Sequence, residues 1–245
     1  MSHDRPDRIV LERPDPPATL EALLTRAVGL AGLRVADLAR RVGLRVPRQH
    51  KFNKGFLGVA VELALGASAK SDPEPDFPAL GVELKTLPLR PDGAPTEDTY
   101  VCQAALDGRD ADHTFATSTV GHKLAKVLFV PYVASGDIPL AERRLAMPFL
   151  WVRDAADEAR LAADWQSLSG RIRRGEADTI GGAEGLVLHL RPKALSASER
   201  TRGLGEDGWL VPVAPKAWYL RRTFTHALVQ RAFGPTPAPP QDTPP

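Results

Sequence analysis

The sequence predicts an α/β protein with a central mixed sheet flanked by helices, and two observations support this. Segments with apolar residues at helical spacing alternate with segments in which apolar residues recur at every second position. The order of these segments is irregular, which favours a mixed sheet over a purely parallel one. The chain has 245 residues, 43% hydrophobic and 25% charged, as in ordinary globular proteins. This length suffices for one large domain or for two subdomains around a cleft.

The first half of the chain is expected to contain three helices and two strands. The apolar spacing predicts helices over Leu20–Leu33, Val35–Val42 and Phe56–Ala69 and strands over Leu80–Pro88 and Thr99–Leu106. Thr19 precedes the first helix and has the hydroxyl group of a good N-cap.

The second half repeats the alternation. A short helix over Ser118–Lys126 is expected to run into a strand over Val127–Val133. The elements expected after it are a strand Phe149–Val152, a helix Ala155–Arg174, strands Leu186–Arg191 and Trp209–Val213, and a helix Ala217–Phe233. The run Gly203–Gly208 fits the dinucleotide pattern GxGxxG by its letters. It is expected to be a loop, because neither a strand before it nor a helix after it is predicted.

Composition excludes several classes of protein. No apolar run approaches the roughly 18 residues of a membrane span, and the N-terminal segment lacks the apolar core of a signal peptide. A single cysteine, Cys102, excludes an intramolecular disulfide framework and a cysteine-rich zinc site. We therefore expect a cytoplasmic protein. Residues 1–17 and the proline-rich residues 235–245 are expected to be disordered tails around a folded domain of residues 18–234.

Charge is unevenly distributed, although the net charge is only +2. Residues 34–54 and 189–222 are rich in arginine and lysine, whereas residues 55–98 between them carry mostly carboxylates. Two basic segments around an acidic centre suit a nuclease, in which the basic parts hold phosphates and the acidic part holds a metal. The same basic runs also fit solvated helix faces, so the charge pattern leaves both interpretations open.

The predicted strand Leu80–Pro88 carries an unusual pair of charges. Because side chains alternate between the faces of a strand, Glu83 and Lys85 project together, opposite Val82 and Leu84. Unpaired buried charges are costly, and a cluster of carboxylate, metal and lysine would offset that cost.

Two further carboxylates belong with this pair. Asp76 lies in a proline-containing turn that can return its side chain to Glu83, and Glu62 is the only charged residue of an otherwise apolar helix. Oxygen ligands suit Mg²⁺, which polarises a phosphate and lowers the pKa of a bound water. A neighbouring lysine orients that water and stabilises the negative charge of the transition state. An internal salt bridge is the alternative for Glu62.

These residues match the PD-(D/E)xK nuclease pattern, and their surroundings extend the match. The sequence resembles the MutH family, the strand-nicking endonucleases of methyl-directed mismatch repair, over roughly residues 18–233. The resemblance rests on Lys54-Gly55-Phe56-Leu57-Gly58, Glu62, Leu65-Gly66-Ala67-Ser68-Ala69, Asp76-Phe77, Leu80-Gly81-Val82-Glu83-Leu84-Lys85-Thr86, His122-Lys123-Leu124, Arg191-Pro192-Lys193-Ala194 and Tyr219-Leu220.

The resemblance implies a restriction-endonuclease-like fold whose two arms form a cleft for double-stranded DNA. It implies nicking 5′ to the G of GATC on the unmethylated strand of a hemimethylated site, with Mg²⁺ (for which Mn²⁺ can substitute). It also implies a monomer activated by MutL with ATP after MutS finds a mismatch, and no membrane partner. The implied catalytic residues are Glu62, Asp76, Glu83, Lys85 and Lys123, the first three of them metal ligands, and the implied DNA-binding residues are Lys54, Arg191, Lys193 and Tyr219.

Two other functions compete with this one. A stand-alone GATC restriction endonuclease of the Sau3AI type has a similar catalytic domain, but such enzymes usually carry a second, related domain for which 245 residues leave no room. A catalytically silent DNA-binding protein would have no use for clustered acids that face phosphates. The complete set of three carboxylates and Lys85 therefore favours a nicking enzyme.

Overall fold

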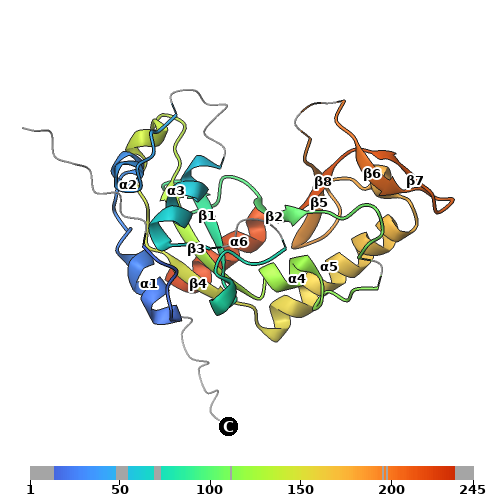
Figure 1. Ribbon diagram of the computed structural model, residues 1–245, viewed down its shortest axis with the longest axis horizontal. Coiled ribbons are helices and arrows are strands. Elements are labelled where there is room, and N and C mark those ends of the chain that lie inside the picture. Colours follow the sequence, from blue (N-terminus) through green and yellow to red (C-terminus); the bar gives the residue numbers. More distant parts are fainter. Residues whose placement is uncertain are drawn as a thin grey trace, which may run out of the picture.

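The computed structural model describes residues 14–47, 55–68, 73–110, 112–194, 196 and 198–234. The expected tails lie almost entirely outside these residues, and so does Lys54. The described elements form two groups in Figure 1: α1, α2 and α3 lie with β1, β3 and β4 on one side, and β5 to β8 lie with α5 on the other.

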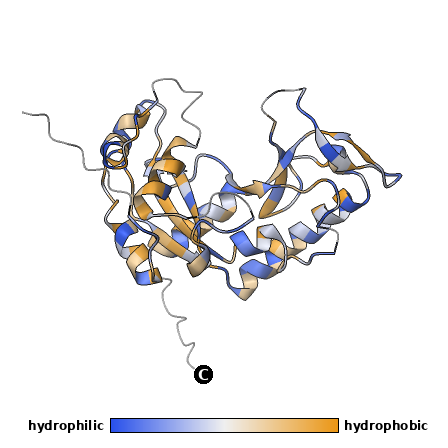
Figure 2. Ribbon diagram, in the orientation of Figure 1, coloured by the Kyte–Doolittle hydropathy of each residue, from blue (hydrophilic) through white to orange (hydrophobic). Residues whose placement is uncertain are grey.

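The first group is built on a mixed three-stranded sheet. Strand β1 (Glu83–Leu89) pairs in parallel with β3 (Lys126–Val133), and β3 pairs antiparallel with β4 (Phe149–Val152). Three helices pack against this sheet: α1 (Leu20–Val28), α2 (Val35–Arg41) and α3 (Phe56–Leu65). Figure 2 shows these strands mainly in hydrophobic colours, as expected for a buried sheet.

The second group is built on an antiparallel three-stranded sheet. Its order is β2 (Thr99–Gln103), β8 (Lys216–Leu220) and β5 (Leu188–Pro192). The long helix α5 (Ala155–Arg173) buries Leu161, Trp165 and Leu168 in the same core as this sheet. The short helix α4 (Thr119–Lys123) and the last helix α6 (Arg222–Phe233) add Val120 and Phe224 to that core.

Strand β1 joins the two cores. Val82, which precedes it, and Leu84 belong to the core of the first group, whereas Leu87 and Leu89 belong to the core of the second. This split follows from the alternation of side chains along a strand. The face of β1 that carries Glu83 therefore continues into the second core.

The remaining elements are short. Strands β6 (Thr201–Leu204) and β7 (Leu210–Val213) form an antiparallel hairpin, and Trp209 beside it is 75% exposed. Single 3₁₀ turns are formed by η2 (Pro78–Leu80), η3 (Leu140–Glu142) and η4 (Ala177–Thr179). Within the described residues, no helix is long and apolar enough to cross a membrane.

The prediction of one central mixed sheet was wrong in part. The fold is α/β, but the described strands divide into a mixed sheet, an antiparallel sheet and the β6–β7 hairpin. Local alternation predicts that a segment is a strand without identifying its partner, and the partners here are far apart in the chain.

Several element predictions also need correction. The expected helix Ala217–Phe233 is a strand, β8, followed by α6, because the buried apolar run of β8 pairs on both sides with other strands. The glycine-rich Gly203–Gly208 is not wholly a loop: its first two residues end β6, and the remainder forms the turn before β7.

Helix α3 is shorter than expected, because it ends at Leu65 instead of Ala69. Gly66 follows with a φ of +78°, a left-handed conformation that favours glycine. A Cβ atom on Gly66 would lie 2.7 Å from the backbone carbonyl oxygens of Pro14 and Asp15. The close approach of the N-terminal segment therefore requires glycine here.

Candidate active site

Asp76 reaches β1 through a tight turn. The backbone N–H groups of Phe77 and Val82 donate to each other's carbonyl oxygens at 2.9 and 3.2 Å, and Gly81 between them has a φ of +62°. This closure brings Asp76 beside the strand, where its Oδ2 accepts a hydrogen bond from the backbone N–H of Leu84 at 2.8 Å. The expected return of Asp76 toward Glu83 is confirmed.

Glu83 lies between two lysines. Its Oε1 is 2.6 Å from the Nζ of Lys85, on the same face of β1 as predicted. The Nζ of Lys123, at the end of α4, lies 3.3 Å from Oε1 and 3.1 Å from Oε2 of the same carboxylate. Lys123 also donates to the backbone carbonyl of Glu74 at 3.0 Å. Since Glu83 is 2% exposed, these ammonium groups compensate a buried charge.

The other two carboxylates are electrostatically coupled to this group. Burial and then the charge of Glu83 raise the pKa of Asp76 above its ordinary value. Burial and then the charge of Asp76 raise the pKa of Glu62, while the charges of Lys85 and Lys123 act in the opposite direction. Glu62 is half-buried on α3.

The donor set fits a hard divalent cation through Asp76 and Glu83. After burial, the charge of Glu83 is the second cause of the raised pKa of Asp76, and a cation between the two carboxylates would relieve this repulsion. Mg²⁺ needs only one or two protein carboxylates, since it keeps several waters and binds substrate phosphates. Among the residues that the structure describes, no three His, Cys, Asp or Glu side chains gather into a metal-binding group. The assignment of Glu62 as a third ligand therefore stays a prediction.

Three of the four residues expected to bind DNA, those within the described part of the chain, lie on or next to the antiparallel sheet. Tyr219 of β8 lies opposite Tyr100 of β2 in register, and the two rings make an edge-to-face contact with centroids 5.6 Å apart. Lys193 follows β5, and its Nζ lies 4.8 Å from the centroid of the Tyr100 ring. The Nζ of Lys85 lies 5.6 Å from the same ring. Glu83, Asp76, Lys85 and Lys123 are called the Glu83 cluster below. Tyr100 connects this cluster with the expected DNA-binding residues.

Arg191 of β5 belongs to the same surface. Its guanidinium carbon lies 5.5 Å from the centroid of the Tyr219 ring, and its Nη1 lies 2.9 Å from Oδ2 of Asp98. His189 precedes it on the same face of β5 and is buried, with Nε2 3.2 Å from the same Asp98 oxygen. The two side chains share a face because they are two positions apart on a strand.

The sequence interpretation missed Tyr100 and Asp98. Tyr100 lies in β2 and Asp98 directly before it. This strand starts at the predicted residue, and nothing in their immediate neighbours distinguishes the two from ordinary strand and loop residues. Their position becomes meaningful only once β2 pairs with β8 and β8 pairs with β5.

Comparison with known proteins agrees with this arrangement. A family model described as the DNA mismatch repair enzyme MutH matches residues 65–164, which include Asp76, Glu83, Lys85 and Lys123. The DNA mismatch repair protein MutH of Serratia proteamaculans (strain 568) is 43% identical over 220 residues, covering 90% of this chain and 96% of the relative. Those of Enterobacter sp. (strain 638) and Klebsiella pneumoniae (strain 342) are each 44% identical over 218 residues, covering 89% of this chain and 94% of the relative. The chain therefore belongs to the MutH family of DNA mismatch repair proteins.

Proposed function

We propose that this protein is a Mg²⁺-dependent endonuclease that nicks the unmethylated strand of hemimethylated GATC sites during mismatch repair. The observation that carries the proposal is the buried carboxylate of Glu83 between Lys85 and Lys123, beside Asp76. Carboxylates and lysines in this arrangement match the needs of phosphodiester hydrolysis, in which negative charge develops on the phosphate oxygens.

Each residue of the cluster has a distinct role in this proposal. Asp76 and Glu83 would hold Mg²⁺, which when bound polarises the phosphate and favours deprotonation of a water. Lys85 orients the attacking water and stabilises the charge of the transition state. Lys123 fixes Glu83, which it contacts through both carboxylate oxygens. Glu62 contributes a further negative charge on the side of α3.

The antiparallel sheet supplies the DNA-binding part. We propose that the two groups of elements in Figure 1 act as the two arms of a restriction-endonuclease-like enzyme, with the DNA between them. Arg191, Lys193 and Tyr219, together with Lys54 from outside the described residues, would contact the recognition site. Lys193 and Tyr219 contact the ring of Tyr100, which also lies beside Lys85, so a bound phosphodiester would reach Glu83 and its neighbours.

The proposal extends to partners and location. The protein would act as a cytoplasmic, nucleoid-associated monomer that MutL activates with ATP after MutS has found a mismatch. A stand-alone restriction endonuclease is less well supported, because the match covers 96% of a relative that is itself a mismatch repair protein.

Strand-resolved digestion tests the proposal. Duplexes with one GATC site, in unmethylated, hemimethylated and fully methylated forms, would be incubated with the protein and Mg²⁺, with and without MutL and ATP. We expect nicks only in unmethylated strands and a faster reaction with MutL. A duplex without GATC and the variant Asp76→Asn serve as controls. Double-strand cutting independent of MutL would favour the restriction enzyme, and the absence of any cutting would overturn the proposal.

A further inference from the structure

Asp98, just before β2, connects three segments that are distant in the sequence. Its Oδ2 lies 2.9 Å from Nη1 of Arg191 and 3.2 Å from Nε2 of His189, both on β5. Its Oδ1 accepts a hydrogen bond of 2.9 Å from the backbone N–H of Arg222, the first residue of α6. The side chain is 17% exposed, so most of its surface is covered by these partners and their neighbours.

The bond to Arg222 fixes the carboxylate independently of Arg191. The first N–H groups of a helix have no partner within the helix, and a side chain usually satisfies one of them. The N-cap residue of α6, Arg221, makes no such bond with its side chain. Asp98 supplies the missing acceptor from 124 positions earlier in the chain. Its place is therefore determined by the fold.

His189 packs beside Asp98 but makes no hydrogen bond to it, because Nε2 of the neutral imidazole is an acceptor. It is 2% exposed, and its Nδ1 lies 2.9 Å from the backbone carbonyl oxygen of Gly182. Since a carbonyl only accepts, Nδ1 carries the proton of that hydrogen bond. Arg221 donates to the carbonyls of Gly182 and Glu184, at 3.1 and 2.9 Å. His189 is thus held against a well-fixed loop.

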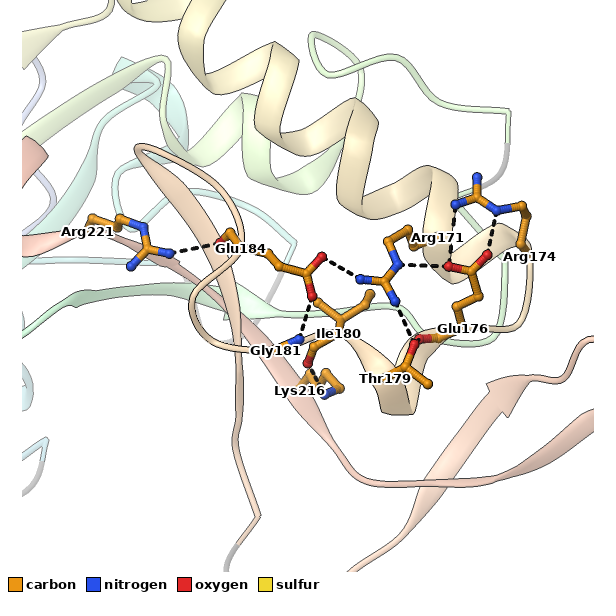
Figure 3. Close-up of polar contacts among 9 residues, drawn as sticks. All are labelled: Arg171, Arg174, Glu176, Thr179, Ile180, Gly181, Glu184, Lys216 and Arg221. Carbon is orange, nitrogen blue, oxygen red and sulfur yellow. Dashed lines mark hydrogen bonds and ion pairs between the residues drawn. The ribbon is translucent and has the colours of Figure 1, made fainter.

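Figure 3 shows how this loop is anchored. The guanidinium of Arg171, near the end of α5, binds the carboxylates of Glu176 and Glu184, and Glu184 accepts a further hydrogen bond from the backbone N–H of Gly181. The buried Lys216 donates to the carbonyl of Ile180 at 2.9 Å. The contacts behind Asp98 therefore extend to α5 and β8.

Arg191 is the exposed member of the group. Its side chain is 48% exposed and, with Asp98, His189 and Arg222, lines one surface pocket. A free arginine side chain carries about 2 kcal/mol of rotamer entropy. The ion pair with Asp98 and the ring of Tyr219 restrict that freedom. Only one of the five N–H donors of the guanidinium takes part in the bond to Asp98.

We propose that Asp98 is a positioning residue that orients Arg191 for reading the base sequence. This inference rests on the proposed function, in which Arg191 contacts the recognition site. An arginine that reads a guanine must present two N–H groups in a fixed geometry, and a preorganised guanidinium discriminates better between bases. Asp98 provides that fixed geometry, and it touches no DNA in this role.

The variant Asp98→Asn tests the proposal most directly. Asparagine keeps an oxygen that can accept from the N–H of Arg222, but it removes the charge that holds Arg191. Asp92→Asn is the matched control, because Asp92 also pairs with an arginine, Arg90, and accepts from a backbone N–H, that of Ala94 at 2.9 Å. Single-turnover nicking rates would be measured on GATC and on duplexes with one base pair changed, together with melting temperatures.

We expect Asp98→Asn to lower the ratio of rates on GATC and altered sites by about five- to tenfold. The melting temperature should change little, and Asp92→Asn should keep the wild-type ratio. In an Arg191→Ala background, Asp98→Asn should have almost no further effect on the ratio, because it acts through that arginine. Asp98→Glu should recover part of the selectivity, since it restores the charge.

Several outcomes would overturn this role. The first is an unchanged ratio of rates on GATC and altered sites in Asp98→Asn. The second is an equal loss of rate in this variant on every duplex. The third is a full additional loss of selectivity when Asp98→Asn is added to Arg191→Ala. If Asp98→Asn does not fold, Asp98→Glu takes its place. The proposal would then be contradicted if the ratio of rates on GATC and altered sites in Asp98→Glu were as low as in Arg191→Ala, because the charge would be present without effect. A wild-type protein without preference for GATC would instead overturn the proposed function itself, and this inference with it.

Discussion

The ammonium group of Lys123 contacts both carboxylate oxygens of Glu83, at 3.3 and 3.1 Å, although the two residues are 40 positions apart. Lys123 ends α4, directly before β3, and β3 pairs in parallel with β1 so that Glu83 lies opposite Val127. This pairing brings the end of α4 to the start of β1. Both side chains are nearly inaccessible to solvent, so each charge depends on the other.

Substitution of the expected metal ligands should separate cutting from binding. In Asp76→Asn and Glu83→Gln, an amide NH2 group replaces one carboxylate oxygen and the negative charge is lost. This weakens metal binding but leaves Arg191 and Lys193 intact. We expect nicking to be abolished while the affinity for GATC duplexes stays within a few-fold of wild type. Nicking assays with Mg²⁺ and equilibrium binding without it check this. A parallel loss of both properties would indicate misfolding instead.

The two lysines should differ in what their removal affects. Lys85→Ala should lower the single-turnover rate far more than the affinity for DNA, because its charge matters most in the transition state. Lys123→Ala should also destabilise the protein, by about 1–3 kcal/mol, because it removes a buried hydrogen-bonding partner of Glu83. Denaturant unfolding and single-turnover kinetics distinguish the two. Near-normal turnover in Lys85→Ala would remove that lysine from the mechanism.

The raised pKa of Glu62 predicts a pH-dependent gain of stability in Glu62→Gln. Between the ordinary carboxyl pKa of 4.5 and the raised one, the folded protein binds more protons than the unfolded chain. The free energy of unfolding therefore falls as pH rises through this window, and the loss persists at pH 7. In metal-free buffer, Glu62→Gln should melt higher than wild type at pH 7, and the difference should vanish below pH 4.5. An equal difference at both pH values would assign the effect to packing.

Arg191→Ala should reduce sequence selectivity. Loss of a base-reading arginine costs about 1–3 kcal/mol of discrimination between GATC and single-base variants. If Arg191 contacts only phosphate, affinity should instead fall equally on all sequences. The slope of log K against log salt should then become shallower by about one. Binding titrations at several salt concentrations and cutting assays on the altered sites separate these outcomes.

Tyr219→Ala and Lys193→Ala should narrow the difference between unmethylated and methylated strands. A methyl group on adenine N6 adds bulk in the major groove, and a side chain packed there excludes it by steric clash. Tyr219 lies in β8, between Tyr100 and His189 in register, and not in the last helix. Rates on both strands of a hemimethylated duplex provide the measurement. Proportional losses on every substrate would refute a sensing role.

Local sequence patterns determined much of the fold. Thr19 caps α1 as expected, with its hydroxyl oxygen accepting from the N–H of Ala22 at 3.1 Å. The predicted strand Phe149–Val152 coincides with β4, and α5 ends one residue before its predicted limit. Caps and side-chain alternation act over a few residues, so a single sequence displays them. Alternation also determined that Glu83 and Lys85 share a face of β1.

Only the tertiary structure decided which strands pair and which charges meet. The apolar run of β8 fits a helix or a strand, and its pairing with β2 and β5 selects the strand. The same pairing places Tyr100 against Tyr219 and brings Asp98 to Arg191. The free energy of these contacts depends on burial and on distances between residues far apart in the chain, which local patterns do not encode. The sequence alone thus determined the charged face of β1, while long-range strand pairing decided which side chains surround it.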